Sequence, residues 1–308
     1  MPVNVFEQLR GVANVSLMFV NTVFWFLPIL VGTAFKLVLP FNPFNRWLSR
    51  FLVWCAESWI GVNRWIMATL MGVRVEMTGD DDLRLERWYL VIANHQSWID
   101  VLALQYVFNR RIPFLKFFIK RQLRWIPFLG QAWWALDMPF MQRYSKSYLV
   151  KHPEKRGTDF ETTRRACEKF KEIPTSVINF VEGTRATPEK IAARRSSYRH
   201  LLPPRSGGIA FAIAAMGEIL HRLVDVTVFY PEGKRRFWDL CCGRISRIIV
   251  DVQLSELPGW VHSGDYANDR EFRQRFQRWL ADIWEEKDRR LKAMAIRYGA
   301  NPALDEAA

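Results

Sequence analysis

The chain has 308 residues, of which 50% are hydrophobic and 24% are charged, a composition that excludes a disordered chain and provides for a sizeable core. This length allows one large domain or two small ones. The net charge of +13 predicts anionic partners: nucleic acid, anionic lipid or phosphate-bearing metabolites.

The cysteines are too few and too scattered for a disulfide framework. They are Cys55, Cys167, Cys241 and Cys242, and none lies in a Cys-x-x-Cys or other metal-ligand spacing. We therefore expect no metal site, and a main body that resides in a reducing compartment.

The first element is an apolar segment. Residues 11 to 35 form a stretch of 25 without a charge, and about 20 apolar residues can span a bilayer. Asn14, Asn21 and Pro28 predict a kinked helix with polar positions. Ten of the 14 tryptophans lie in the first 134 residues, a bias typical of a membrane interface.

A second helix is predicted over residues 46 to 71. Arg50, Glu57 and Arg64 recur at seven-residue intervals and so share one stripe of this helix. Charges at the bilayer centre are costly, so the helix is expected to lie in the interface rather than to span. Residues 1–71 are therefore interpreted as a membrane-anchoring helical hairpin; the alternative is a hairpin that packs into the core.

Residues 72–308 predict an α/β domain with a mainly parallel sheet flanked by helices and a helical C-terminal part. Strands are expected over 88 to 93, 175 to 181, 224 to 229 and 247 to 254, and helices over 159 to 171 and 268 to 297. Asp225 and Thr227 alternate with valines, so their strand is expected to have one wetter face.

The segment Asn94-His95-Gln96-Ser97-Trp98-Ile99-Asp100 follows the first of these strands and enters a helical pattern. If Ser97 caps the helix, the Asp100 carboxylate can reach His95 and fix its tautomer, which leaves the other ring nitrogen free to take a proton from an alcohol. The alternative is structural, because Ser-x-x-Asp is also a helix-capping pattern.

A second candidate segment, residues 179 to 185, ends the next strand. Gly183 allows close backbone approach to a ligand, Thr184 offers a hydroxyl, and Arg185 a fork suited to phosphate. Residues 204 to 208 then lead into a helix over 209 to 216, which is either an anion site or an ordinary helix start. Residues 110 to 125 hold six basic side chains and no acid, and residues 185 to 205 hold six against one.

Together these segments resemble the glycerolipid acyltransferase family, which includes 1-acylglycerol-3-phosphate acyltransferase. The resemblance rests on His95-x-x-x-x-Asp100, on Glu182-Gly183-Thr184-Arg185, and on two further blocks at residues 120 to 143 and 226 to 231. It covers roughly residues 70 to 235, with the blocks in the family's order.

The resemblance implies acyl transfer from an acyl-CoA or acyl carrier protein thioester to the hydroxyl of lysophosphatidic acid, with no other cofactor. It implies that His95 is the general base and that Asp100 orients it. The residues that it assigns to the acceptor are Lys120, Arg143, Glu182, Gly183, Thr184 and Arg185.

Two positions depart from the family pattern. Val181 stands where the family commonly has proline, and Gln142 where an acid often precedes the arginine. Another lysophospholipid or a glycerol phosphate is therefore the alternative acceptor. A different class of alternative is a non-catalytic basic protein that binds anionic lipid or nucleic acid, although nothing resembles a nucleic-acid-binding signature. The expected location is a bacterial inner membrane, with the catalytic domain on the cytoplasmic side.

Overall fold

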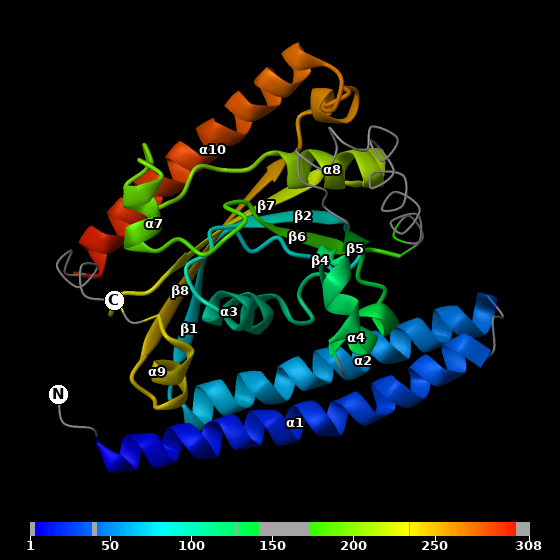
Figure 1. The fold of residues 1–308 in the computed structure, drawn as a ribbon, viewed down its shortest axis with the longest axis vertical. Coiled ribbons are helices and arrows are strands. Elements are labelled where there is room, and N and C mark those ends of the chain that lie inside the picture. The colour runs from blue at the N-terminus through cyan, green and yellow to red at the C-terminus, as the bar shows by residue number, and fades with distance from the viewer. Residues whose placement is uncertain are drawn as a thin grey trace.

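The structure is a computed structural model that describes residues 4–38, 42–126, 129–141, 170, 173–233 and 235–299. Its centre is a six-stranded sheet in the order β1-β8-β7-β2-β6-β3. Helices lie on both faces of this sheet, and the long apolar α1 lies at the outside (Figure 1). The predicted α/β class with a mainly parallel sheet is confirmed.

The strands of the main sheet are β1 (Arg74–Gly79), β2 (Tyr89–Ala93), β3 (Leu115–Phe117), β6 (Ser176–Phe180), β7 (Arg222–Phe229) and β8 (Arg247–Glu256). Neighbouring strands run parallel except β7 and β8, which pair antiparallel. β4 (Ile119–Lys120) and β5 (Phe140–Met141) form a separate two-stranded sheet. β1 and the short strands β3 to β5 were not predicted, since they carry no extended apolar run.

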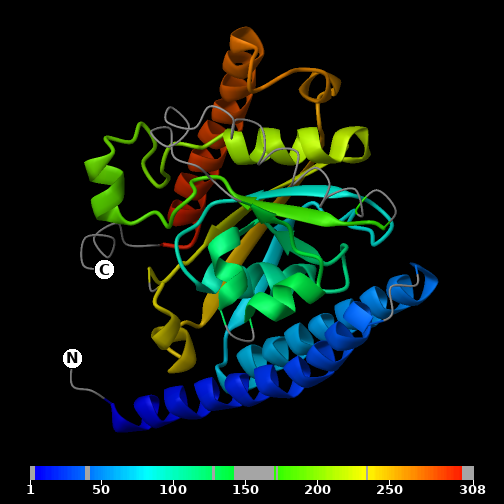
Figure 2. The same ribbon diagram turned by 45° about the vertical axis from the view of Figure 1, so that its right-hand side comes forward.

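Helices form layers on either side of the sheet, as two views show (Figures 1 and 2). One face packs against α8 (Gly207–Met216), the 3-10 turns η5 (Gly217–Ile219) and η6 (Gly259–His262), and α10 (Arg270–Arg297). The other packs against α3 (Ile99–Phe108), α9 (Phe237–Cys241) and the π-helical turn η1 (Ile66–Leu70). Beyond α3 lies a hairpin of α1 (Val5–Val38) and α2 (Asn42–Trp65), which shares a third core with α4 (Leu129–Ala135). The remaining elements are η2 (Arg121–Trp125) and α7 (Pro188–Ala193).

Strand β2 is buried at every position, as its continuous apolar run predicts. The prediction of a wetter face on β7 is wrong. Asp225 and Thr227 are buried, because α10 covers that face and places the Lys287 ammonium 2.5 Å from an Asp225 carboxylate oxygen. The alternation of polar residues therefore marks a buried ion pair and not a solvated surface.

Helix α1 exposes most of its large apolar side chains and buries two asparagines. Asn14 Nδ2 donates to the Cys241 carbonyl at 2.8 Å, and Asn21 Nδ2 donates to Asn63 Oδ1 at 2.9 Å. The exposed large side chains of α1 are Val5, Phe6, Leu9, Val12, Leu17, Phe19, Val20, Val23, Phe24, Leu27, Leu30, Val31, Phe35 and Val38. Exposing so large an apolar surface to water is unfavourable, so the outer face of α1 fits contact with lipid.

Two residues of the charged stripe of α2, Glu57 and Arg64, contact the body of the protein. Arg64 lies over the Tyr106 ring at 4.8 Å, and Glu57 lies 3.6 Å from Arg110. The α2 helix begins at Asn42 and ends at Trp65, whereas the sequence predicted residues 46 to 71; the last turn is the π-helical η1.

Candidate active site

Three chain segments meet where β2, β6 and β7 end. His95 follows β2, Glu182 follows β6 and Tyr230 follows β7. Because these strands are hydrogen-bonded neighbours running in the same direction, their carboxyl ends meet at one edge. Asn94 bonds across this edge, its side chain donating to the Val228 carbonyl at 3.0 Å and accepting the Val228 N–H at 2.8 Å.

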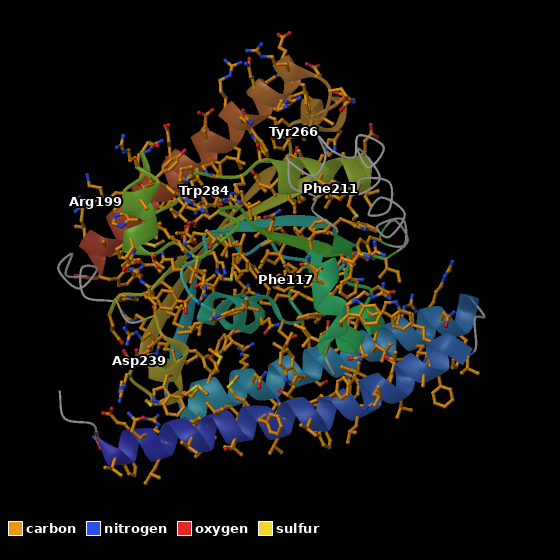
Figure 3. All side chains as sticks on the ribbon, viewed as in Figure 1. Phe117, Arg199, Phe211, Asp239, Tyr266 and Trp284 are labelled. Atoms are coloured by element: carbon orange, nitrogen blue, oxygen red, sulfur yellow. The ribbon has the colours of Figure 1, made fainter. Side chains whose placement is uncertain are left out.

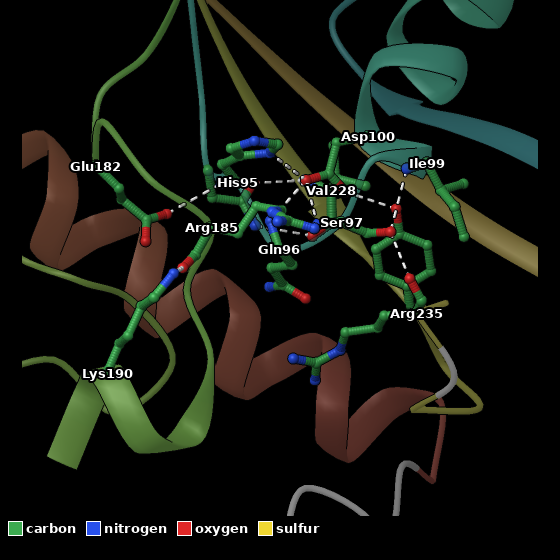
Figure 4. Close-up of polar contacts among 12 residues, drawn as sticks. His95, Gln96, Ser97, Ile99, Asp100, Glu182, Arg185, Lys190, Val228 and Arg235 are labelled. Atoms are coloured by element: carbon green, nitrogen blue, oxygen red, sulfur yellow. Dashed lines mark hydrogen bonds and ion pairs between the residues drawn. The ribbon is translucent and has the colours of Figure 1, made fainter. Parts of the chain in front are cut away.

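His95 and Asp100 form the pair that the sequence predicted. His95 Nδ1 lies 2.9 Å from Asp100 Oδ2, and the imidazole is 15% exposed (Figure 4). One face of the imidazole stacks on Phe180 with a ring separation of 4.2 Å. If Nδ1 donates its proton to Asp100, Nε2 keeps a lone pair that can accept another.

The Asp100 carboxylate has four donors around it. Oδ2 accepts the N–H groups of Gln96 and Ser97 at 2.6 and 2.8 Å in addition to the histidine, and Oδ1 accepts the Tyr230 hydroxyl at 2.5 Å. Burial, and then the negative charge of Asp100, raises the pKa of the Tyr230 phenol well above its usual range, so the phenol remains a donor. The carboxylate is therefore fixed on both oxygens.

The capping expected of Ser97 takes a different form. Helix α3 begins at Ile99 with Trp98 at the N-cap position, so Ser97 is not the N-cap residue. Its hydroxyl still accepts the Ile99 N–H at 3.1 Å and donates to the Arg235 carbonyl. The Asp100 carboxylate accepts the Gln96 and Ser97 N–H groups, which directly precede the helix.

Glu182 is fully buried and is hydrogen-bonded to the backbone of His95. Its Oε1 accepts the backbone N–H of His95 at 3.0 Å, and its Oε2 accepts that of Leu202 at 3.1 Å. Burial raises the pKa of the Glu182 carboxyl to about 8, against the lowering effect of these two N–H groups. Both oxygens have protein partners, so the geometry suits Glu182 to holding the His95 backbone rather than to contacting an acceptor.

The segment after Glu182 brings positive charge to His95. The Ala186 N–H donates to the His95 carbonyl at 2.6 Å, and the exposed Arg185 guanidinium lies over the Trp98 ring at 5.0 Å. Lys190 of α7 donates to the Thr184 hydroxyl and to the Arg185 carbonyl, both at 3.1 Å. Two cations thus belong to the segment that is hydrogen-bonded to the His95 backbone.

Gly183 has a backbone conformation that favours glycine. Its φ is +68°, and a Cβ there would lie 3.1 Å from Arg205 Cδ. Any other residue here would strain the turn that delivers Thr184 and Arg185 and would require the Arg205 side chain to shift.

The structure brings together His95, Asp100, Glu182, Gly183, Thr184 and Arg185. Arg143 and the predicted helix over 159 to 171 lie outside the described residues, and Lys120 is described only in its backbone. Tyr230, Phe180 and Lys190 were not singled out from the sequence. The position of Tyr230 just after a predicted strand was the available signal, because strand ends meet at one edge. Among the described residues no group of three or more histidine, cysteine or acidic side chains could hold a metal.

Known proteins resemble this chain in the region that contains the site. The model of the family described as Acyltransferase matches residues 74–231. Lysocardiolipin acyltransferase 1 of Mus musculus is 26% identical over 88% of this chain and 71% of its own length. The 1-acyl-sn-glycerol-3-phosphate acyltransferase of Saccharomyces cerevisiae is 28% identical over 50% of this chain and 43% of its own length.

A solved structure has the same fold. The 1-acyl-sn-glycerophosphate acyltransferase PlsC of Thermotoga maritima aligns with a TM-score of 0.50 at 16% identity, covering 92% of this chain and 97% of that one. At this identity the likeness concerns the fold. It extends beyond residues 74–231 to most of the chain.

Proposed function

The chain belongs to the acyltransferase family, and on that premise we propose that it moves a fatty acyl group from an acyl-CoA or acyl carrier protein thioester to the free hydroxyl of lysophosphatidic acid. The observation that carries this proposal is the His95–Asp100 pair at the carboxyl edge of the sheet, with Arg185 and Lys190 beside it. A base serves the hydroxyl, and the cations serve a phosphate.

In the proposed reaction, His95 acts as general base. Asp100 accepts from Nδ1–H, and Nε2 takes the proton of the acceptor hydroxyl as its oxygen attacks the thioester carbonyl carbon. The tetrahedral intermediate collapses with cleavage of the carbon–sulfur bond, and the thiolate takes the proton from the imidazolium. A thiol with a pKa of about 8.5 leaves readily, so no enzyme nucleophile is needed.

The acceptor phosphate is proposed to bind Arg185, with Lys190 in support and Lys120 and Arg143 as further candidates. Arginine offers two parallel N–H donors to phosphate oxygens, and the Trp98 ring supports its guanidinium. We assign Gly183 and Thr184 to the shape of this turn and Glu182 to its buried anchorage.

The membrane is proposed to contact α1. This is the one helix of the described residues that is long and apolar enough to cross a bilayer. Ion pairs hold both of its ends to the body, Glu7 to Arg244 at 2.7 Å and Lys36 to Asp137 at 2.8 Å. A helix pinned along the body fits one that lies in the interface, so we propose that residues 1–71 anchor the 72–308 catalytic domain in this way.

The proposed location is the cytoplasmic side of a bacterial inner membrane. This proposal rests on the sequence, whose four cysteines form no disulfide framework.

A second candidate acceptor is another lysophospholipid. Relatives include lysocardiolipin acyltransferase 1 and, in Caenorhabditis elegans, lysophosphatidylinositol acyltransferase 10, so acceptors differ among similar chains. The departures at Val181 and Gln142 favour the same alternative.

The test is acyl transfer by the purified full-length protein in phospholipid vesicles. Acyl-CoA and acyl carrier protein are offered as donors, and lysophosphatidic acid, other lysophospholipids and glycerol phosphate as acceptors, with product and free thiol measured. We expect phosphatidic acid from lysophosphatidic acid. Preference for another lysophospholipid would select the second candidate, and inactivity with every pair would favour a non-catalytic lipid- or nucleic-acid-binding protein.

A further inference from the structure

The C-terminal helix α10 lies outside the residues that match the family model, yet it is hydrogen-bonded to the segment that holds the active site. Helix α10 begins at Arg270, whereas the match ends at residue 231. Figure 3 shows Trp284 on the side of α10 that faces the sheet, and Arg199 near α7. The α10 residues that carry these bonds occupy one helical face.

Three bonds attach residues 199 to 202 to this face. Trp284 Nε1 donates to the Leu202 carbonyl at 3.0 Å. Asp288, one turn further along α10, accepts the N–H of Arg199 at 3.0 Å and that of His200 at 2.8 Å. Trp284 and Leu202 are both fully buried, so water cannot replace their bond.

Leu202 carries the connection onward to the catalytic histidine. Its carbonyl is held by Trp284, while its N–H donates to Glu182 Oε2 at 3.1 Å. The other Glu182 oxygen accepts the N–H of His95 at 3.0 Å. Three consecutive buried or partly buried bonds therefore join α10 to the backbone of His95.

We infer that Trp284 is a positioning residue for the acyl transfer: through Leu202 and Glu182 it fixes the backbone from which the His95 imidazole projects. The alternative is a purely structural role, in which Trp284 fills the core and the active site takes its shape without it. The two differ in what happens to turnover in a folded variant, because misplacing a catalytic base by about 1 Å can cost on the order of 100-fold in rate.

Helix α10 also places a buried charge that acts on Glu182. Lys287 lies between Trp284 and Asp288 in the sequence and is fully buried, and burial lowers the pKa of its ammonium. Burial raises the pKa of the Glu182 carboxyl, and the positive charge of Lys287 opposes that rise. Helix α10 thus supplies both the anchor and a charge to the group that holds His95.

The test uses Trp284→Phe in the full-length protein, which removes the indole N–H and keeps an aromatic ring. Trp279→Phe is the matched control, since Trp279 also lies on α10, where its ring contacts Trp260 and Phe276 edge-on. Leu291→Ala, in the same core, controls for lost stability. We expect Trp284→Phe to lower kcat by about 10- to 100-fold with KM changed by less than about twofold, and both controls to keep kcat within about twofold.

Two further readouts separate positioning from a core role. Trp284→Phe combined with Glu182→Ala should lower kcat no further than Glu182→Ala alone, because both act on one connection. NMR of histidine-labelled protein should show displaced His95 ring resonances in Trp284→Phe and unchanged ones in Trp279→Phe. If Trp284→Phe does not fold, Asp288→Ala takes its place in the test. This variant removes the neighbouring attachment at a more exposed site and should displace the same His95 resonances.

The kinetic arm rests on the proposed function, and the NMR arm does not. Inactivity of the wild type with every acceptor would count against acyl transfer, while the His95 resonances would still decide the positioning role. Unmoved resonances in folded Trp284→Phe, kcat equal to that of the controls, or rate losses that multiply in the double variant would each overturn the inference.

Discussion

The side chains at the site differ in exposure and in hydrogen-bond partners, and these differences indicate which of them can contact a ligand. Arg185 is exposed and stacked on Trp98, so it is available to a ligand, whereas Asp100 and Glu182 are buried and saturated with donors. We therefore separate the groups that are proposed to meet substrate, His95 and Arg185, from the buried groups that hold the site.

Arg185→Ala tests the phosphate-binding role. The variant should raise the KM for the lysophospholipid by at least about 10-fold, because a hydrogen bond to a charged group contributes roughly 1.5–3 kcal/mol. The KM for the acyl thioester should change little. Initial rates over both substrates measure this, and an effect confined to the thioester would assign Arg185 to the donor.

Glu182→Gln tests the buried carboxyl by its effect on pH-dependent stability. The unfolded chain releases this proton near the ordinary pKa of 4.5, and the folded chain keeps it up to about 8. The unfolded state thus binds fewer protons in this window, so the group's contribution to stability is present below about pH 4.5 and is lost as the pH rises through 8. The neighbouring charges are Asp100, which raises the pKa, and Lys287, which lowers it.

Glu182→Gln has no such proton to lose. Denaturant unfolding of both proteins between pH 5 and 9 should give a wild-type curve that falls more steeply with pH. Parallel curves would show that this carboxyl is ionised throughout.

At the scale of elements, α1 combines an exposed apolar face with a polar stripe that faces the protein. Phe19 and Phe24 are 67% and 63% exposed, while Asn14 and Asn21 are buried. The same asparagines that interrupt the apolar run in the sequence make the bonds that dock the helix onto α2 and onto the residue that ends α9.

The double variant Phe19→Glu/Phe24→Glu should weaken binding to vesicles of anionic phospholipid by at least about 100-fold, since burying each phenylalanine contributes roughly 1.5–3 kcal/mol. Flotation assays measure this, with Leu85→Glu, an exposed leucine outside α1, as control. Equal flotation of the double variant and the control would remove α1 as the membrane contact.

At the scale of the whole molecule, α10 clamps β7 and β8 through buried charges. Asp225 pairs with Lys287 and with Arg290, and Arg290 also pairs with Asp251 at 3.2 Å. Asp225→Ala would leave the fully buried Lys287 without its carboxylate, and we expect a loss of about 3–5 kcal/mol in the free energy of unfolding.

The control is Arg289→Ala on the same helix. Its ion pair with Glu286 is exposed, so the expected loss is about 0–1 kcal/mol. Chemical denaturation compares the two, and equal losses would mean that the buried network contributes no more than a surface pair.

Several features that depend on local pattern could be predicted from the sequence. The apolar run of β2 predicted a buried strand, and the spacing of His95 and Asp100 predicted their contact, since both lie within one turn of the β2–α3 connection. Contacts between distant segments were not predictable. Tyr230 reaches Asp100 across 130 residues, and α10 covers Asp225 of β7, so a residue expected at a wet face is buried.

The central claim is that the His95 imidazole, oriented by Asp100, takes the proton of the acceptor hydroxyl. The most direct measurement is the initial rate of acyl transfer by His95→Ala beside the wild type in the same vesicles, with folding and vesicle binding verified for both. The account predicts a rate at least about 100-fold lower, the usual contribution of a general base. A folded, membrane-bound His95→Ala that transfers acyl groups at the wild-type rate would contradict it.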